Sequence, residues 1–295
     1  MTRTTPLDVT SATVEAFLAR TTEDAGFAAE VGTRTGSPAE STATLLCDLA
    51  SEVRRAATLL HGLPCHEGAR VLEIGSGPGL VAALLHQQGV DVTGLDPIVE
   101  GFEASMAVQK VLADRMSMPT IMPIAAADLN PVKHGMFDLI FSVNVLEHIR
   151  PLVPNLDGLA RVLAPGGLMI HTCPNYRMPY EPHYRLVLAP GRPAWTRYIL
   201  RSTGREPVWQ SLNWITAGSV RRFARRHNLT LTFLRGETIA ALDRLRDDPH
   251  FARRHRGLIA TTLRALDAVG LSHLLGRLPA TWTTPMTFIL KGPDV

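Results

Sequence analysis

Cysteine, lysine and long apolar runs are scarce in this chain of 295 residues. Its three cysteines are odd in number and lack zinc-ligand spacing, which predicts reduced thiols and argues against a disulfide framework. We therefore expect no bound metal. The sequence also has no run of eighteen apolar residues and no apolar signal core near Met1. These absences argue against a membrane-spanning helix and a secretory leader, so we expect a soluble, cytoplasmic protein.

Lysine accounts for only three of the 30 basic residues, and the other 27 are arginine, although the net charge is only +3. Ten arginines and four acidic residues lie between Arg221 and Arg256. This stretch fits an anionic-membrane or nucleic-acid surface, but charge runs are usually solvated helix faces, which is the interpretation we favour. Stacking aromatics are not interleaved with the arginines, which disfavours RNA as a partner and leaves peripheral membrane contact open.

Hydrophobic residues make up 45% of the chain, enough for one large domain with a sizeable core. Residues 1–40 are polar and without strong periodicity, and we expect them to form a loosely packed segment. The domain proper then covers 41–295. It would begin with an amphipathic helix from Ser41, a candidate N-cap, to His61.

A glycine-rich turn at 75–79 is the strongest motif in the chain. Residues 71–74 predict a strand, and residues 80–88 predict a helix that ends at Gly89. The three alternate glycines between them can adopt positive φ and leave the backbone open to a ligand. The start of the helix offers free N–H groups to an anion. Dinucleotide-binding folds use a similar turn, so this motif alone leaves the ligand undecided.

A second strand, 91–96, follows the helix at once and ends in Asp96. A strand, a helix and a strand within about thirty residues form a βαβ unit, whose right-handed crossover makes the two strands parallel. Asp96 then lies near the glycine turn, where its carboxylate can accept hydrogen bonds from both hydroxyls of a ribose. The alternative is an Asp that caps the next helix ahead of Pro97.

Five more strands are predicted. The run 137–143 is almost entirely apolar, which is typical of a central parallel strand buried on both faces. A turn at Pro165-Gly166-Gly167 would stop one helix, 154–163, and redirect the chain into a strand. The remaining elements are a helix at 99–117, a helix from Ser219 to about His227, and strands at 120–124, 168–172, 229–234 and 284–290.

Three segments carry a family resemblance: Glu-Ile-Gly-Ser-Gly-Pro-Gly at 73–79, Asn-Val-Leu-Glu-His at 144–148 and the turn at 165–167. They resemble class I S-adenosylmethionine (SAM)-dependent methyltransferases of the ubiquinone type. The resemblance implies an α/β fold with a doubly wound, mostly parallel, Rossmann-like sheet of seven strands. Helical additions would lie at the N-terminus and between the last two strands, and 174–215 and 235–283 would be insertions on the substrate side.

SAM is the cofactor that this resemblance implies. In the family, the loop equivalent to 125–129 lies beside the adenine, where Asp128 would bind the exocyclic amine and Leu129 would supply an apolar edge. An exposed loop carboxylate is the competing interpretation of Asp128. The expected cofactor-binding residues are Glu73, Gly75, Ser76, Gly77, Gly79, Asp96, Pro97, Asp128, Leu129 and Asn144.

Catalytic candidates follow two strands whose C-terminal ends should face the ligand crevice. His148 is either a base or substrate orienter, or a histidine bound to backbone at a helix start. The loop 174–184 is dense in proline, aromatic and ionisable residues, which suits an acceptor pocket, although a stiff surface loop is the alternative. The catalytic candidates are His148, His183 and Glu181. The substrate-binding candidates are Asn175, Tyr176, Tyr180, Tyr184 and Trp214.

The reaction that follows from the resemblance is methyl transfer to oxygen or nitrogen of a small organic acceptor, by in-line displacement. The alternatives are a membrane-associated quinone or lipid methyltransferase, an RNA methyltransferase, and a catalytically silent SAM-binding regulator. A homodimer is left open.

Overall fold

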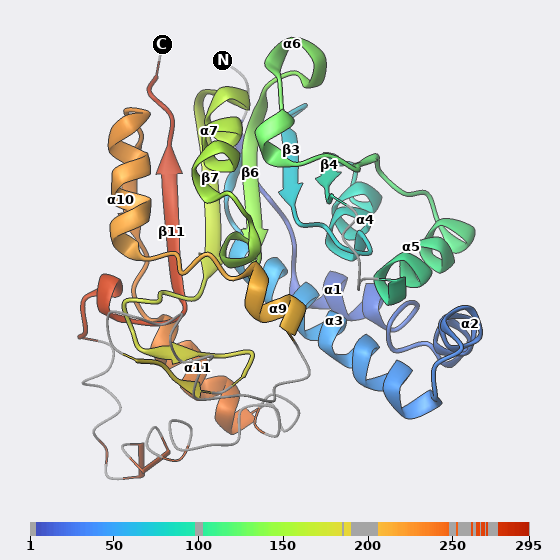
Figure 1. Cartoon of the computed structure of the whole chain (residues 1–295). Coiled ribbons are helices and arrows are strands. Elements are labelled where there is room, and N and C mark those ends of the chain that lie inside the picture. Colours follow the sequence, from blue (N-terminus) through green and yellow to red (C-terminus); the bar gives the residue numbers. More distant parts are fainter. Residues whose placement is uncertain are drawn as a thin grey trace. The chain divides into compact units, whose positions relative to one another are not determined.

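The structure is a computed structural model that describes residues 4–97, 103–184, 186–189, 206–247 and 277–294, with single positions between 252 and 270. The chain divides into two compact units (Figure 1). The first consists of Met1–Val143, Val153–Ile170 and Gly292–Val295. The second consists of Asn144–Leu152 and His171–Lys291.

The central sheet has seven strands, hydrogen-bonded in the order β10-β11-β7-β6-β3-β4-β5. Strand β3 pairs in parallel with β4 and β6, β4 pairs in parallel with β5, and β10 pairs antiparallel with β11. This confirms the predicted α/β fold with its mostly parallel, seven-stranded sheet. The strands are β3 (Arg70–Ile74), β4 (Asp91–Leu95), β5 (Ile121–Met122), β6 (Phe137–Val143), β7 (Leu163–Cys173), β10 (Thr230–Phe233) and β11 (Met286–Lys291).

The core of the first unit surrounds β3 and β6, which align Val71 with Leu139 and Leu72 with Ile140. All four side chains are buried, as expected for parallel strands covered on both faces. Strand β3 leads through the glycine turn at 75–79 into α4 (Leu80–Gln87) (Figure 1). The first six residues of α4 are buried. The other helices of this unit are α1 (Ser11–Leu18), α2 (Ala25–Thr35), α3 (Ala39–Leu60), α5 (Glu103–Arg115), α6 (Pro131–His134) and most of α7 (Leu152–Val162).

The N-terminal segment is ordered, so the prediction of a loosely packed 1–40 was wrong for residues 4–40. Strand β1 (Thr4–Pro6) pairs with β2 (Pro64–His66), and Thr10 and Asp24 cap the next two helices with side-chain oxygens. Phe17 and Phe27 are completely buried. Phe17 is buried together with Val14 and Leu18, and Phe27 together with Val31, so each short helix packs a small apolar face against the unit.

Several predicted boundaries also change. Helix α3 begins at Ala39 after Pro38, so Ser41 is not its N-cap. The predicted turn at Pro165-Gly166-Gly167 lies inside β7, where Gly166 has φ +69° and donates its N–H to Pro293 O. Strand β5 is only two residues long. Of the predicted helix 99–117, residues 99–102 lie outside the described part of the chain.

The second unit holds short elements between and after the sheet strands: η2 (Leu146–His148), β8 (Tyr180–Glu181), β9 (Leu186–Val187), α9 (Glu206–Ser211), α10 (Ala217–Arg226), α11 (Glu237–Asp247) and η4 (Ala280–Trp282). Helix α10 exposes four arginines and buries Val220 and Phe223. Of the predicted insertion 235–283, residues 248–251 and 271–276 and most positions between them lie outside the described part of the chain. Among the residues that are described, no helix is both long and apolar enough to cross a membrane.

Candidate functional site

The glycine turn of the first unit has an unusual backbone. Gly75, Gly77 and Gly79 all have positive φ, at +65°, +50° and +80°. A Cβ at Gly79 would lie 2.6 Å from Ile121 Cδ1, whereas one at Gly77 would meet no atom within 4 Å. Gly79 is therefore required by internal packing. Gly77 keeps one side of the turn open, which suits the approach of a ligand to the backbone.

Asp96 lies beside this turn, as the βαβ unit predicts. Its Oδ2 accepts a hydrogen bond from Gly77 N at 2.5 Å, and Leu95 O accepts from Gly75 N at 2.7 Å. Burial raises the pKa of Asp96, and the hydrogen bond from Gly77 opposes that shift. The carboxylate thus holds the turn with one oxygen and is only partly exposed. Pro97 is exposed and ends the described segment.

A buried carboxyl group underlies the turn. Glu73 is 7% exposed, and its Oε2 has no hydrogen-bond partner among the described residues. Burial raises the pKa of Glu73 to about 8, and Asp96 adds a smaller repulsive contribution. Ser76 is also buried, and the described part of the chain offers its Oγ no partner. Both groups keep hydrogen-bonding capacity next to the turn.

The predicted adenine loop is tied to α7 by contacts that the sequence did not reveal. Asn155 Oδ1 accepts from Ala127 N at 3.0 Å, and the Arg161 guanidinium donates to the carbonyl of Ala127 at 2.7 Å. Asp128 is exposed, so its side chain is accessible. Leu129 is only 2% exposed and packs in the core, so its predicted contact with the adenine stays a prediction.

In the second unit, the segment after β6 is held by Asn213, which the sequence analysis missed. The Asn213 side-chain amide donates to Leu146 O at 2.5 Å and to Ile149 O at 2.8 Å. Asn144 has φ +54°, a left-handed conformation that Asn tolerates better than most residues, and it donates its N–H to Thr172 O. These bonds fix the backbone that carries Glu147 and His148.

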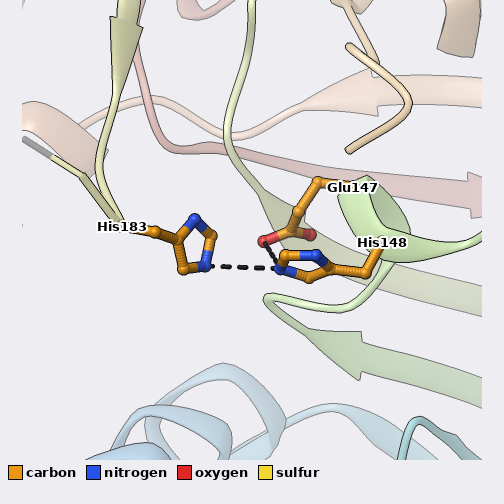
Figure 2. A group of neighbouring side chains, drawn as sticks. All are labelled: Glu147, His148 and His183. Atoms are coloured by element: carbon orange, nitrogen blue, oxygen red, sulfur yellow. Dashed lines mark hydrogen bonds and ion pairs between the residues drawn. The ribbon is translucent and has the colours of Figure 1, made fainter. Parts of the chain in front are cut away.

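His148 and His183 meet, although 35 positions separate them in sequence. Their Nε2 atoms are 3.3 Å apart, and the rings stand edge to face with centroids 4.9 Å apart. Glu147 Oε1 lies 3.9 Å from His148 Nε2 (Figure 2). The imidazoles are about one quarter exposed, whereas the Glu147 side chain is completely buried. Both histidines were predicted as catalytic candidates from the sequence, but Glu147 was not.

Glu181 contacts this cluster through His183. Its Oε1 accepts from Tyr176 Oη at 3.2 Å and lies 2.6 Å from His183 Nδ1, and its Oε2 accepts from Tyr184 N at 2.7 Å. The Glu181 side chain is 0% exposed. A group so enclosed contacts His183, and this argues against the role of proton acceptor that the sequence predicted for Glu181.

The electrostatics of the cluster keep its groups in defined states. Burial, with a further contribution from His183, lowers the pKa of His148 to about 4, so this imidazole is neutral at pH 7. Burial also raises the pKa of Tyr176, followed by repulsion from Glu181, so the phenol keeps its proton. The cluster therefore presents two accessible imidazoles above a buried carboxylate, an arrangement able to accept a proton or to bind a cation.

The remaining acceptor candidates have different surroundings. Asn175 is completely buried, and its amide links Thr281 O, Thr283 O and Ala217 N, so its geometry favours a structural role over substrate contact. Tyr180 is partly exposed at the start of β8. Four aromatic rings form a chain of edge-to-face contacts with centroids 5.0–5.4 Å apart, in the order Tyr176, Trp214, Trp209 and Tyr184.

A protein-family model described as a methyltransferase domain matches residues 44–233. The uncharacterised protein Rv1509 of Mycobacterium tuberculosis is 34% identical over 223 residues, which cover 72% of this chain and 75% of that protein. A ubiquinone biosynthesis O-methyltransferase of Roseobacter denitrificans is 27% identical over 158 residues, covering 48% of this chain and 62% of the relative.

Solved structures with a similar fold include phosphoethanolamine N-methyltransferase 2 of Haemonchus contortus in complex with S-adenosyl-L-methionine. It shares 17% identity with this chain, at a TM-score of 0.49. The match covers 96% of this chain but only 60% of the other, so this chain spans about three fifths of that protein's length.

Proposed function

This chain belongs to the class I SAM-dependent methyltransferases, and from that premise we propose that it methylates an oxygen or nitrogen atom of a small organic acceptor. Its relatives include ubiquinone biosynthesis O-methyltransferases, which supports a hydroxylated acceptor. The observation that carries the acceptor half of the proposal is the pair of partly exposed imidazoles, His148 and His183, backed by buried Glu181.

We assign the cofactor to the glycine turn. The open face at Gly77 admits the nucleoside, and Asp96 binds the ribose hydroxyls with the oxygen that it does not share with Gly77 N–H. Ser76 Oγ, which has no partner among the described residues, supplies one more polar contact. SAM supplies the reactive methyl group. The role of the protein is to orient this group toward the acceptor and to exclude water.

The acceptor side must remove a proton, because a neutral hydroxyl or ammonium group is a poor nucleophile. The acceptor O–H or N–H bond breaks as the proton passes to the histidine cluster. The freed lone pair forms a bond to the methyl carbon, and the carbon–sulfur bond breaks. Its electron pair stays on sulfur, which gives S-adenosylhomocysteine. His148 and His183 are thus the catalytic residues, and Glu181 positions His183.

The cofactor assignment is tested by calorimetric titration of SAM into the protein and into two matched variants. Asp96→Asn removes the charged acceptor at the turn and should weaken SAM binding about tenfold or more. Asp91→Asn, on the same strand but exposed, should leave the affinity unchanged. Equal affinities for all three proteins would remove Asp96 from the cofactor site.

The transfer itself is tested with labelled SAM and extracts of the source organism, followed by mass spectrometry of the labelled product. We expect one labelled small molecule with a new O-methyl or N-methyl group. SAM binding without any labelled product would instead identify a regulator, and label in RNA would identify the RNA methyltransferase alternative.

A further inference from the structure

We propose that Glu147, His148 and His183 form a binding site for one divalent transition-metal ion of the zinc type. The three residues offer one ligand atom each, and these atoms all lie within 4.8 Å of one another (Figure 2). Metal binding is a property of these side chains alone. Its catalytic meaning, activation of the acceptor, rests on the proposed function.

The hydrogen bonds around the two imidazoles determine which nitrogen carries the proton. Ser211 donates its hydroxyl hydrogen to Val208 O at 2.7 Å, so its Oγ accepts from His148 Nδ1, also at 2.7 Å. Glu181 Oε1 accepts from His183 Nδ1 at 2.6 Å. The Nδ1 atom of each ring therefore points to an oxygen atom, and the two Nε2 atoms point to each other.

The two Nε2 atoms are only 3.3 Å apart, so either a proton or a metal cation must lie between them. The completely buried Glu147 carboxyl group, 3.9 Å from His148 Nε2, adds a third donor directed to the same point. Neutral imidazole together with carboxylate is the donor set that zinc and its neighbours in the first transition row prefer.

The spacing agrees with a metal site in quantitative terms. Two nitrogens bound to zinc at about 2.0–2.1 Å with a tetrahedral angle stand roughly 3.3–3.4 Å apart. The observed separation of the two Nε2 atoms, 3.3 Å, already has this value. The Glu147 oxygen lies farther out, 3.9 Å from His148 Nε2 and within 4.8 Å of the His183 ligand atom, so this carboxyl group must move toward the two rings to bind the ion.

The second layer of contacts also matches a metal site. Metal-binding histidines usually donate their other N–H to a carboxylate or a hydroxyl, which fixes the ring and increases its basicity. Glu181 does this for His183, and Ser211 does it for His148. Three protein ligands leave a fourth position open, and the rings are about one quarter exposed. The geometry therefore points to an ion that coordinates an acceptor hydroxyl or water and lowers its pKa.

The test uses full-length protein without a polyhistidine tag, stripped of metal with a chelator and titrated with Co²⁺. We expect one equivalent to bind, with the visible absorption of a four- or five-coordinate site, and Zn²⁺ to displace it. His148→Ala and His183→Ala should each weaken binding more than about 100-fold, and Ser211→Ala about 10- to 100-fold. His61→Ala, an exposed histidine, is the matched control and should change nothing.

SAM affinity and circular dichroism of the same samples separate the outcomes. Intact SAM binding with no Co²⁺ uptake, or Co²⁺ uptake that both histidine variants retain, would overturn the metal site and leave the proposed function standing. In the first case, a proton shared between the two Nε2 atoms replaces the metal. Co²⁺ uptake without SAM binding would overturn the proposed function instead. If an alanine variant fails to fold, His183→Gln replaces it in the titration.

Discussion

The glycine turn of the first unit and the histidine cluster of the second are built from different parts of the chain. At the turn, the groups available to a ligand are backbone N–H groups and glycines in the left-handed region, and the carboxylate of Asp96 accepts a hydrogen bond from Gly77 N. At the cluster, side chains from three separate segments meet, because His148 contacts both His183 and Ser211. A backbone site suits a ligand that never changes, such as a cofactor. A side-chain site can change with the acceptor.

The two regions also treat their buried carboxyl groups differently. Glu73 lies under the turn with Oε2 lacking a partner among the described residues, whereas Glu181 is bonded to Tyr176, His183 and Tyr184. A buried carboxyl group that is poorly bonded becomes neutral, and one with several donors serves as an acceptor. The comparison predicts that changes at the cluster act on chemistry, and changes at the turn act on cofactor affinity and stability.

The largest expected effect is that of His183→Ala on the rate. Loss of this group should lower kcat for the identified acceptor about 10²- to 10⁴-fold, because proton removal loses its partner. SAM affinity should stay within twofold of the unchanged protein, since the glycine turn is untouched. Rate assays and calorimetry on one sample check both statements. A full rate, or a parallel loss of SAM binding, would contradict the division between the two regions.

The next effect is a change in pH-dependent stability at Glu73. Its pKa is about 8 in the folded protein and near 4.5 in the unfolded chain, so the folded state holds a proton that the unfolded chain releases. The contribution of this group to stability therefore falls as pH rises from about 4.5 to 8.

Glu73→Gln cannot ionise, so it should remove this fall and gain about 2–4 kcal/mol relative to the unchanged protein between pH 5 and pH 9. Urea unfolding at several pH values without SAM measures the difference. Glu40→Gln, an exposed residue, is the control and should leave the pH profile as it was. Parallel profiles for the Glu73 variant would show that this carboxyl group ionises normally.

The smallest effect compares two glycines of the same turn. Both have positive φ, so alanine should cost each about 1–2 kcal/mol in backbone strain. A methyl group at Gly79 would also lie 2.6 Å from Ile121 Cδ1 and 3.0 Å from Met118 Cε, and displacing these two side-chain ends should add about 1 kcal/mol, whereas Gly77→Ala meets open space. Urea unfolding should thus rank Gly79→Ala as the less stable. SAM titration of Gly77→Ala should show a loss of binding free energy larger than the variant's loss of unfolding free energy. The reason is that the added methyl group lies on the open side of the turn, where we expect the ligand to approach.

Much of the fold could be predicted from the sequence because its signals are local. The βαβ unit follows from apolar runs, three glycines and chain length, and these features place Asp96 beside Gly77 before any coordinates are known. The antiparallel pair β10–β11 follows from the family resemblance. The N-terminal helices were missed because each is short and buries only two or three apolar side chains, such as Phe17 and Phe27, among many small polar residues.

The acceptor site could be predicted only in part. His148 and His183 were selected from their positions after strand ends, but no local pattern reports that two histidines 35 positions apart will touch. Ser211 and Asn213 carry no motif, and they become visible only once α9 is seen against η2. One sequence signal for this site was available. A glutamate lies within two positions of a histidine at 147–148 and again at 181–183, and each of these pairs follows a predicted strand.

The chain of aromatic rings from Tyr176 to Tyr184 gives the protein a built-in optical reporter. Trp209 and Trp214 stand in edge-to-face contact, and both outer tyrosines bond to Glu181, the residue that orients His183. Indole emission is sensitive to nearby charge and to quenching by transition-metal ions. Events at the imidazole pair should therefore be readable as intrinsic fluorescence, without a dye or a labelled ligand.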